Sequence, residues 1–467
     1  MTDHLTAFAD LATLLGADAV VAGPEIEPRY RQEFFSTTPI PCQPRLLLKP
    51  RDTAGVAAAL RYCHEHRLPV VVQGGMTGLS GGALPNDGEV LLSLERLRGI
   101  EELDVAAGTL TVLAGTPLQE AQAAAEAAGF LLAIDLGARG TCQVAGNVST
   151  NAGGNRVIRY GMTRQQVLGL EAVLADGTIL SSLNKMLKNN AGYDLKHLFI
   201  GSEGTLGVVT RVVFRLEPLP TATQTAFCAV PSYAAVVRLL RHAQQRPAGR
   251  LSAFEVMWRD YYEFATRRVP GRRAPLSTEA PFYILLDLQG ADAETDGAAF
   301  AAMLEAALED ELIVDAAIAA SAREAQDFWH IRDAPGDFTK VWPQLISFDV
   351  SLPIGSIGEF VEKLTPRLQA AFPGCEAVNF GHIGDSNLHV CAAVPGTTPE
   401  TFPAKGLKDC LYSLLRDYGG SVTAEHGVGT EKKDYLAYCR SPEEIALMRT
   451  LKAALDPHGI LNPGRVL

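Results

Sequence analysis

Four residues near the C-terminal end of the chain have the types and spacing of a metal site with a proton acceptor beside it. His382 and His389 flank Ile383-Gly384-Asp385-Ser386, a short run rich in turn-forming residues. If one strand delivers the first histidine and a second strand carries the other, the two imidazoles converge and could bind a divalent ion. Two histidines at this spacing fit core or strand-pairing positions equally well, so further ligands are needed. Glu425 is the candidate third ligand. His426 beside it is a candidate base, or else a surface or helix-start histidine.

Three glycine-rich segments could hold a large anionic cofactor. The first follows three consecutive valines and places five glycines among residues 74–82. Successive backbone N–H groups in such a loop form an anion site suited to a pyrophosphate. The second segment, 135–154, combines small residues with Asn and Thr, and the third, 201–207, leads into another run of β-branched residues. One such segment alone fits a surface loop, whereas three in order favour a cofactor site.

Composition excludes several classes of protein. The chain has 467 residues, 47% of them hydrophobic, which is enough for two or three domains. Its net charge of −12 argues against nucleic acid or anionic membranes as general partners, so an anionic substrate must meet local positive charge. Eight scattered cysteines without a CxxC pair argue against an iron–sulfur cluster and indicate thiols in a reducing compartment.

The N-terminal residues predict neither a signal peptide nor a basic transit peptide, because they carry acid and no early arginine. No apolar run approaches the roughly 18 residues that a transmembrane helix needs. The sequence therefore predicts a soluble, cytoplasmic protein without a transmembrane segment.

The elements that must position these residues follow two patterns. The pattern of the N-terminal part predicts a helix and a Pro-rich lead-in within 1–44. A βαβ unit follows, formed by 45–50, 52–66 and 70–73. After it we expect a strand at 89–94, a helix near 117–128 and a hairpin at 169–180. After a boundary at Leu219-Pro220, strands at 223–230, 281–288, 311–318, 345–350, 375–381 and 387–394 alternate with helices at 232–245, 297–309, 321–333 and 355–372. This second pattern predicts an α+β layer with helices covering one sheet. Residues 400–467 are predicted to be mostly helical.

Taken in order, the motifs resemble those of the vanillyl-alcohol-oxidase-type FAD flavoproteins. More narrowly, the chain is similar to the D-2-hydroxy acid dehydrogenases, which include D-lactate, D-2-hydroxyglutarate and glycolate-oxidising members. The resemblance spans nearly the whole chain and rests on 74–82, 140–154, 201–207, 382–389, 425–427 and 457–463. It implies an α+β fold that is not a Rossmann fold. The expected parts are a two-subdomain FAD-binding domain at 1–218, a substrate-capping domain with the metal ligands at 219–417, and a helical segment at 418–467 that returns to the flavin.

The resemblance also implies which residues contact FAD. Members with covalently bound flavin have a histidine where this chain has Met76-Thr77, so non-covalent FAD is expected. Met76 itself departs from the glycine usual in these dehydrogenases. The expected cofactor-binding residues are Gly74, Gly75, Met76, Thr77, Gly78, Leu79, Ser80, Gly140, Thr141, Gly146, Asn147, Asn151, Gly153, Gly154, Glu203, Gly204, Gly207, Val208 and Asn462.

For the reaction, the resemblance implies oxidation of a D-2-hydroxy acid to the 2-oxo acid, with hydride passing to flavin N5. An alcohol is too weak an acid for an unaided base at neutral pH, so family members hold a divalent metal, Zn²⁺ favoured and Mn²⁺ possible, that stabilises the alkoxide. The expected ligands are His382, His389 and Glu425, with His426 as the catalytic base. Asp385 is interpreted as a turn residue or as a partner of a ligating histidine.

Arg332 is the expected catalytic-site residue for the substrate carboxylate, because arginine binds carboxylates through two parallel hydrogen bonds. The alternative is an ordinary helix-surface charge. Three positions depart from the pattern of the 2-hydroxyglutarate enzymes, where Gly336, Ser347 and Cys391 stand in place of a threonine, a lysine and an asparagine. These changes remove an anchor for a second carboxylate, which Lys340 could replace. They favour a monocarboxylic or bulkier acid and leave the substrate open.

Two other functions stay open at this stage. One is a flavin oxidase that uses O₂, and the other is a partner-dependent flavin subunit of a glycolate-oxidase-like respiratory complex. Without iron–sulfur cysteines, electrons are expected to leave through an acceptor protein or a quinone. A homodimer is possible.

Overall fold

The computed structural model describes residues 2–33, 39–246 and 249–467, so part of the predicted Pro-rich lead-in, 34–38, lies outside the described residues. The chain forms two units. The first unit consists of the residues up to Gly154, Gly161–Leu219 and Glu425–Leu467, and the second of Asn155–Tyr160 and Pro220–Ala424. The predicted domain limits at 218/219 and 417/418 stay a prediction.

A small mixed sheet positions the first glycine-rich loop. Its strands occur in the order β1 (Val20–Ala22), β2 (Leu46–Leu48), β4 (Val90–Ser93) and β3 (Val70–Gln73). Helix α2 (Thr53–Glu65) connects β2 to β3, and the Asp52 side chain caps it by accepting from the N–H of Gly55 at 2.7 Å. The predicted βαβ unit is present, but β4 lies between its two parallel strands. Strand β4, whose four residues are all buried, is therefore an interior strand of this sheet.

A second, antiparallel sheet of the first unit carries the third glycine-rich segment. Its order is β5 (Ile100–Asp104), β6 (Thr109–Leu113), β10 (Val208–Arg215), β8 (Val167–Val173) and β9 (Ile179–Ser182). Residues 201–207 lead directly into β10. The remaining elements of this unit are α1 (Thr2–Leu15), α3 (Leu118–Ala127), β7 (Phe130–Leu131), α4 (Val144–Thr150), α6 (Thr163–Gln166), α7 (Lys196–Phe199), β11 (Glu217–Pro218) and α14 (Pro442–Leu455).

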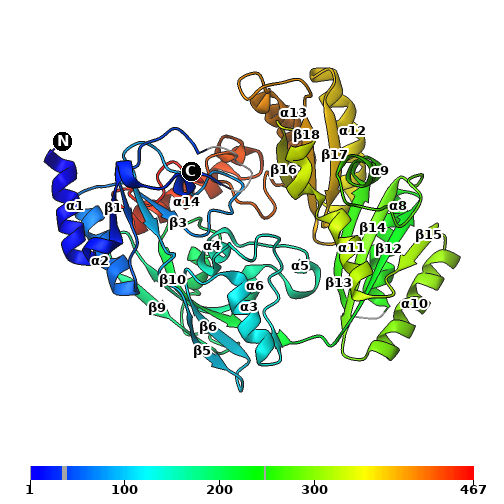
Figure 1. Ribbon diagram of the computed structural model, residues 1–467, viewed down its shortest axis with the longest axis horizontal. Helices are drawn as coiled ribbons and strands as arrows, with labels where there is room; N and C mark the ends of the chain where they lie inside the picture. The colour runs from blue at the N-terminus through cyan, green and yellow to red at the C-terminus, as the bar shows by residue number, and fades with distance from the viewer. Residues whose placement is uncertain (1, 34–38, 247–248) are drawn as a thin grey trace. The chain divides into compact units, whose positions relative to one another are not determined.

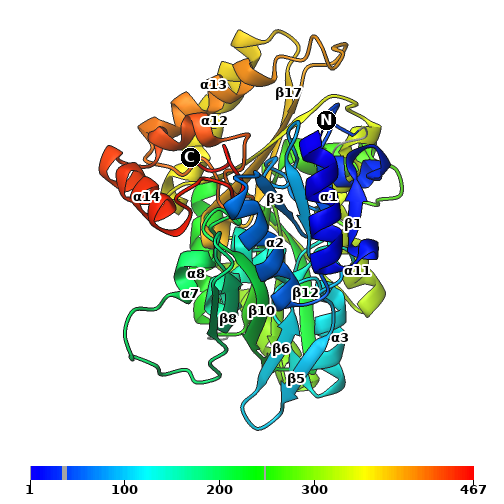
Figure 2. The ribbon, with the colours of Figure 1, turned by 90° about the vertical axis from the view of Figure 1, so that its left-hand side faces the viewer.

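The C-terminal tail is bonded alongside β3, as Figures 1 and 2 show. Leu461 pairs with Val70 in parallel, and the Asn462 side chain accepts from the N–H of Val72 at 2.9 Å. The fully buried Arg465 forms an ion pair with Glu89 at 2.6 Å. The tail is therefore part of the first unit's core, because a buried pair of this kind is costly to break.

The second unit is built on one seven-stranded sheet (Figure 1). Its strands are antiparallel to their neighbours, in the order β15 (Asp315–Ile318), β12 (Ala222–Val230), β14 (Phe282–Gly290), β13 (Leu251–Trp258), β17 (Glu376–Gly381), β18 (Asn387–Ala393) and β16 (Ile346–Ser351). The helices are α5 (Val157–Tyr160), α8 (Tyr233–Gln245), α9 (Arg259–Glu263), α10 (Ala293–Glu309), α11 (Ala322–Arg332), α12 (Ile357–Ala371) and α13 (Ala404–Asp417).

Strand β13 is the strand of this sheet that the sequence pattern did not predict. All eight of its residues are buried, but Ser252 and Glu255 interrupt the apolar run that would indicate a buried strand. The other strands of this sheet lie within a few residues of their predicted limits. One face of the sheet packs with α9, α11 and the 3₁₀ segment Ala334–Lys340 around an aromatic core that includes Phe328, Phe338 and Phe380.

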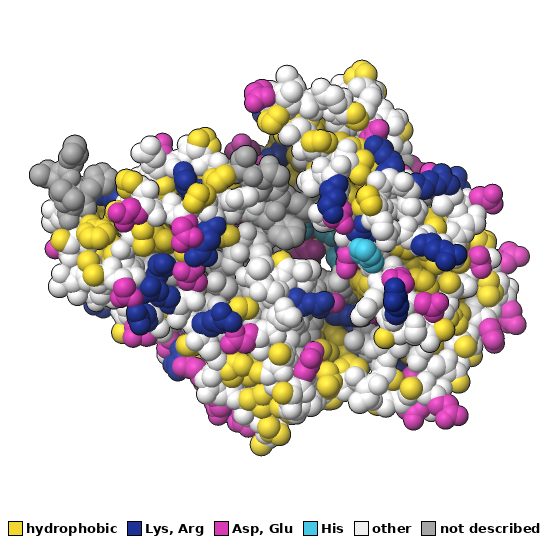
Figure 3. Space-filling model, viewed as in Figure 1, with side chains coloured by type: hydrophobic (Ala, Val, Ile, Leu, Met, Phe, Trp, Pro, Cys, Tyr) yellow, Lys and Arg dark blue, Asp and Glu magenta, His cyan; other side chains and the backbone are white. Residues whose placement is uncertain are grey.

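On the face seen in Figure 3, basic and acidic side chains are interspersed. Among the described residues, no helix combines the length and apolar character that a membrane span requires.

Candidate active site

The predicted turn between two strands brings His382 and His389 together. His382 directly follows β17, a short 3₁₀ turn (Ile383–Asp385) comes next, and Ser386 takes φ +74° before β18 begins. His389 lies opposite Phe380 in the β17–β18 register. The two buried imidazole rings lie 5.3 Å apart, centroid to centroid, at nearly a right angle. This geometry lets both rings present a nitrogen to one small space.

Glu255, from the unpredicted strand β13, holds the first histidine. Its Oε1 lies 2.7 Å from Nδ1 of His382, and its Oε2 accepts from Nε of Arg332 at 2.7 Å. Burial alone would raise the pKa of Glu255, but the hydrogen bonds and charges of His382 and Arg332 outweigh it and hold the pKa at about 2. The carboxylate therefore stays ionised and favours the Nδ1–H tautomer of His382, which leaves the Nε2 lone pair as an acceptor.

Arg332 lies at the end of α11 with its side chain only 11% exposed, so it is not the surface charge of the alternative interpretation. Besides Glu255, its Nη2 lies 3.0 Å from Nε2 of His382, and its guanidinium stands over the Phe380 ring at 5.4 Å. Although burial disfavours the charge, Glu255 opposite raises the pKa of Arg332. The arginine is thus permanently charged and held within reach of a histidine predicted to bind metal.

Asp349 is the carboxylate that faces the second histidine, His389. It faces His389 across β16 and β18, with Oδ1 at 3.8 Å from Nδ1 of the ring. Its carboxylate is fully buried and accepts from the side chains of Asn387 (2.8 Å) and Thr423 (2.9 Å) and from the N–H of Ala424 (3.0 Å). Asp349 therefore fixes both the histidine strand and the chain that runs into Glu425.

Sequence reasoning missed both carboxylates. It interpreted Asp385 as a turn residue or as a partner of a histidine, and Asp385 lies in the 3₁₀ turn. The available signal was a single acidic residue inside an otherwise apolar strand, as in Ala-Phe-Glu255-Val-Met and Ser-Phe-Asp349-Val. A buried lone carboxylate needs a partner, and here the partners are the site histidines and Arg332.

Strained backbone marks the predicted cofactor-binding segments of the first unit. Eight non-glycine residues in the described parts of the chain have positive φ, and four of them are predicted FAD contacts. These four are Met76 (+54°), Asn151 (+51°), Glu203 (+53°) and Asn462 (+43°). Such conformations cost free energy and cluster at functional sites. The strain therefore supports a ligand-binding role for these segments.

The residues of these segments fit a flavin nucleotide. A Cβ at Gly75 would overlap the carbonyl oxygen of Thr141, so the first and second glycine-rich segments pack backbone to backbone. Helix α4 carries Gln143 and Asn147 at its start and on the next turn, and their buried side-chain oxygens have no hydrogen-bond partner among the residues that the structure describes. Acceptors of this kind suit the hydroxyl and N–H donors of such a ligand.

The other predicted contacts lie along the same segments. Gly140 and Thr141 precede α4, Gly146 lies within it, and Gly153 and Gly154 follow it. Gly204, Gly207 and Val208 lie at the start of β10. Residues 74 and 76–80 form the loop after β3, in which Ser80 donates its hydroxyl to the carbonyl of His426 at 2.9 Å.

Glu425 and His426 belong to the first unit, whereas His382, His389 and Arg332 belong to the second. Within the first unit, Oε2 of Glu425 accepts from the N–H of Gly154 at 2.7 Å. Joint metal binding by the three predicted ligands stays a prediction.

The positions that were expected to bear on the choice of substrate carry small side chains, apart from Lys340, whose side chain forms an ion pair at the surface. Gly336 has open space where a Cβ would stand. Ser347 lies opposite Cys391, whose thiol contacts its hydroxyl at 3.7 Å. Lys340 forms an ion pair with Asp337, and its side chain is 67% exposed. None of these positions adds a charge beside Arg332, whose Nη1 lies 3.9 Å from the Asp333 carboxylate.

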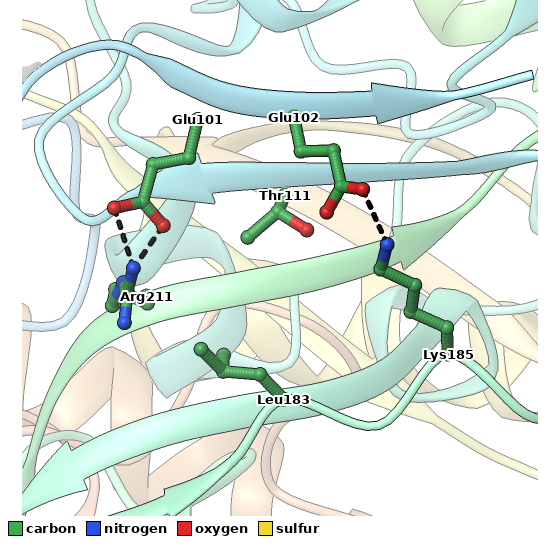
Figure 4. Close-up of a pocket in the computed structure, with 6 residues that line it drawn as sticks. All are labelled: Glu101, Glu102, Thr111, Leu183, Lys185 and Arg211. Atoms are coloured by element: carbon green, nitrogen blue, oxygen red, sulfur yellow. Dashed lines mark hydrogen bonds and ion pairs between the residues drawn. The ribbon is translucent and has the colours of Figure 1, made fainter.

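A cavity of about 380 Å³ lies elsewhere in the first unit, over the antiparallel sheet (Figure 4). Arg211 pairs with Glu101 and Lys185 pairs with Glu102, so its charges satisfy one another. We assign it no chemical role.

Comparisons with known proteins give the class. Residues 44–182 match the FAD binding domain, and residues 219–466 match the C-terminal domain of FAD linked oxidases. The chain is 40% identical to mitochondrial D-2-hydroxyglutarate dehydrogenase of Bos taurus, covering 91% of this chain and 77% of the relative. It is 38% identical to D-2-hydroxyglutarate dehydrogenase of Xanthomonas citri, covering 91% and 89%. The structure of p-cresol methylhydroxylase with bound substrate superposes with a TM-score of 0.77 at 18% identity, covering 100% of this chain and 97% of that one.

The fold is accordingly the FAD-binding fold of the vanillyl-alcohol-oxidase type, as predicted. The chain belongs to the D-2-hydroxy acid dehydrogenase family of FAD-linked oxidoreductases, which act on CH–OH groups. FAD as the cofactor agrees with the sequence expectation.

Replacing Asp349 with Asn tests its structural role. The amide has one acceptor oxygen and leaves a buried donor unsatisfied, so the free energy of unfolding of the second unit should fall by about 1–3 kcal/mol. Denaturant unfolding measures this change. Asp327→Asn, an exposed change in α11, should stay within about 0.5 kcal/mol. Equal effects of the two substitutions would contradict the role assigned to Asp349.

Proposed function

We propose that the protein oxidises a D-2-hydroxy acid to the 2-oxo acid with the help of a divalent metal, and that the electrons pass from FAD to an acceptor other than oxygen. The observation that carries this proposal is the Glu255 carboxylate shared by His382 and Arg332. It holds a metal-type ligand and an anion-binding residue at adjacent positions with fixed orientation.

The charge balance of the second unit supports a metal. Arg332 is paired with the Glu255 carboxylate at 2.7 Å, and Oδ1 of Asp333 lies 3.9 Å from its Nη1. Asp349 adds another carboxylate beside His389. An anionic substrate entering such a group would meet excess negative charge, which a divalent cation offsets. His382, His389 and Glu425 are the ligands we propose, with Zn²⁺ favoured and Mn²⁺ as the alternative.

Each group has a separate part in the proposed reaction. When bound, FAD supplies N5 as hydride acceptor, and the metal supplies positive charge that makes a nearby hydroxyl more acidic. His426 accepts the hydroxyl proton, and the hydride leaves the Cα carbon. Arg332 binds the substrate carboxylate through Nη groups and fixes which face of the Cα carbon presents its hydrogen.

The contact between Arg332 and Nε2 of His382 has a consequence for this proposal. A ligand that takes the Nε2 lone pair removes the acceptor of Arg332 Nη2. The freed N–H then suits a carboxylate oxygen. Metal binding and substrate carboxylate binding should therefore support each other.

For the substrate, the relatives named above point to D-2-hydroxyglutarate, whereas the residues of this chain favour a smaller or apolar side chain. Gly336, Ser347 and Cys391 offer no charge for a second carboxylate, and Lys340 forms its ion pair with Asp337 at the surface. We propose a monocarboxylic D-2-hydroxy acid as the preferred substrate. A higher kcat/KM for D-2-hydroxyglutarate than for D-lactate would contradict this proposal.

The acceptor is proposed to be a protein or a quinone, and the location cytoplasmic. A flavin oxidase remains the alternative, and rapid reoxidation of the reduced flavin by air would favour it. Activity of the isolated chain with a dye acceptor would exclude a purely partner-dependent subunit.

Anaerobic bleaching of the flavin tests the proposal. The oxidised flavin absorbance should be lost with one or more D-2-hydroxy acids and not with their L-enantiomers, because Arg332 and the metal fix one face of the Cα carbon. A chelator should abolish bleaching, and Zn²⁺ or Mn²⁺ should restore it. Full bleaching after the chelator removes all divalent metal would contradict metal assistance.

His426→Ala tests the assigned base. The limiting rate of flavin reduction should fall by about 10² or more while FAD stays bound, because the proton acceptor is lost. Stopped-flow absorbance measures the rate. His330→Ala, which removes an exposed histidine of α11, is the control and should leave the rate unchanged. An unchanged rate in His426→Ala would reassign the base.

A further inference from the structure

The loop that carries Glu425 and His426 is hydrogen-bonded to the segments predicted to bind FAD. Residues 425–431 form no helix or strand. The N–H of Gly154 donates to the Glu425 carboxylate at 2.7 Å, and the Ser80 hydroxyl donates to the His426 carbonyl at 2.9 Å. The Ser80 carbonyl also accepts from the N–H of Thr430 at 3.0 Å. All these groups lie within the first unit.

Glu203 makes the third attachment, through both oxygens of its carboxylate. Its Oε1 accepts from the N–H of Val428 at 2.6 Å, and its Oε2 accepts from the N–H of Gly429 at 2.8 Å. Two consecutive backbone N–H groups form a small anion-binding nest, and this carboxylate fills it. Burial raises the pKa of Glu203, and the two N–H bonds together with the charge of Lys432 oppose this rise, because they favour the carboxylate form.

The backbone of Glu203 is held so that its side chain points at this loop. Its φ of +53° is unfavourable for a residue with a side chain, and hydrogen bonds hold both sides of the residue. Its N–H donates to the carbonyl of Ser149 at 2.8 Å, and its carbonyl accepts from the Asn462 side chain at 2.6 Å. A Cβ at Gly427 would stand 2.8 Å from Oε1 of Glu203, so the loop packs directly against the carboxylate.

We propose that Glu203 is a positioning residue that holds loop 425–431, rather than a residue whose carboxylate contacts FAD. Because Ser80, Gly154 and Glu203 come from the three glycine-rich segments, FAD binding to those segments orders the loop. The catalytic consequence rests on the proposed role of His426, whereas the ordering of the loop does not. The chain thereby acquires its catalytic geometry only when the cofactor is in place.

Glu203→Gln in the FAD-loaded protein tests this assignment. Glutamine has one acceptor oxygen for two N–H donors, so amide exchange at Val428 and Gly429 should quicken by about tenfold to a hundredfold. Hydrogen exchange read by mass spectrometry on peptides covering 425–431 measures this. With a substrate that bleaches the flavin, the limiting reduction rate should fall by a similar factor while the apparent substrate Kd stays within about twofold.

Glu171→Gln is the matched control. Glu171 is a buried carboxylate of the same unit that accepts from the hydroxyls of Thr53 and Thr210 and does not contact the loop. This variant should leave exchange at 428–429 and flavin reduction unchanged. Unchanged exchange in Glu203→Gln, or equal changes in both variants, would overturn the proposal. If no 2-hydroxy acid bleaches the flavin, the proposed function fails, and the exchange result still decides the role of Glu203.

If the Glu203→Gln variant does not fold, hydrogen exchange on the unaltered chain tests the same coupling. Exchange of peptide 425–431 should be at least about tenfold slower with FAD than after the flavin is removed, while helix α13 of the second unit should not change. Equal protection of 425–431 with and without FAD would overturn the coupling.

Discussion

The carboxylate of Glu255 is the constraint on which the proposed chemistry depends, because it binds a histidine and an arginine at the same time. Strand β13 places it beside β17, with Val256 opposite Gly381, so it reaches the first residue after that strand. Removing this carboxylate would leave Arg332 as an uncompensated buried charge and free the His382 ring to choose either tautomer. The orientation of a proposed metal ligand and of the proposed substrate anchor therefore has one common cause.

The first unit uses a different principle, in which backbone groups rather than side-chain charges form the site. The glycine-rich segments pack so closely that Cβ atoms at Gly75 and Gly429 would overlap neighbouring carbonyl oxygens. Between them, a few non-glycine residues are held at positive φ by hydrogen bonds from other segments. A site of this kind binds a ligand with many acceptors and donors, and loop 425–431 is hydrogen-bonded to the same segments.

Much of this could be predicted from the sequence because the signals are local. The turn between His382 and His389, the helix predicted at 52–66 and the strand at Val70–Gln73 depend on residues within a few positions. The roles of Glu255 and Asp349 were not predicted because their histidine partners, His382 and His389, lie 127 and 40 residues further along the chain. The charged Glu255 also interrupts the apolar run by which strand β13 could have been predicted. Glu203 was predicted as a flavin contact from its motif, whereas its side-chain hydrogen bonds run to a loop 225 residues later.

The most direct test of the central claim is the affinity of the FAD-loaded protein for Zn²⁺ and Mn²⁺, measured by competition with a chelator in the unaltered chain and in Glu255→Gln. We expect one tightly bound ion per chain and an affinity about 10–100-fold weaker in the variant, because a histidine without its orienting carboxylate is a poorer ligand. Absence of a stoichiometric ion, or equal affinity in the two proteins, would contradict it.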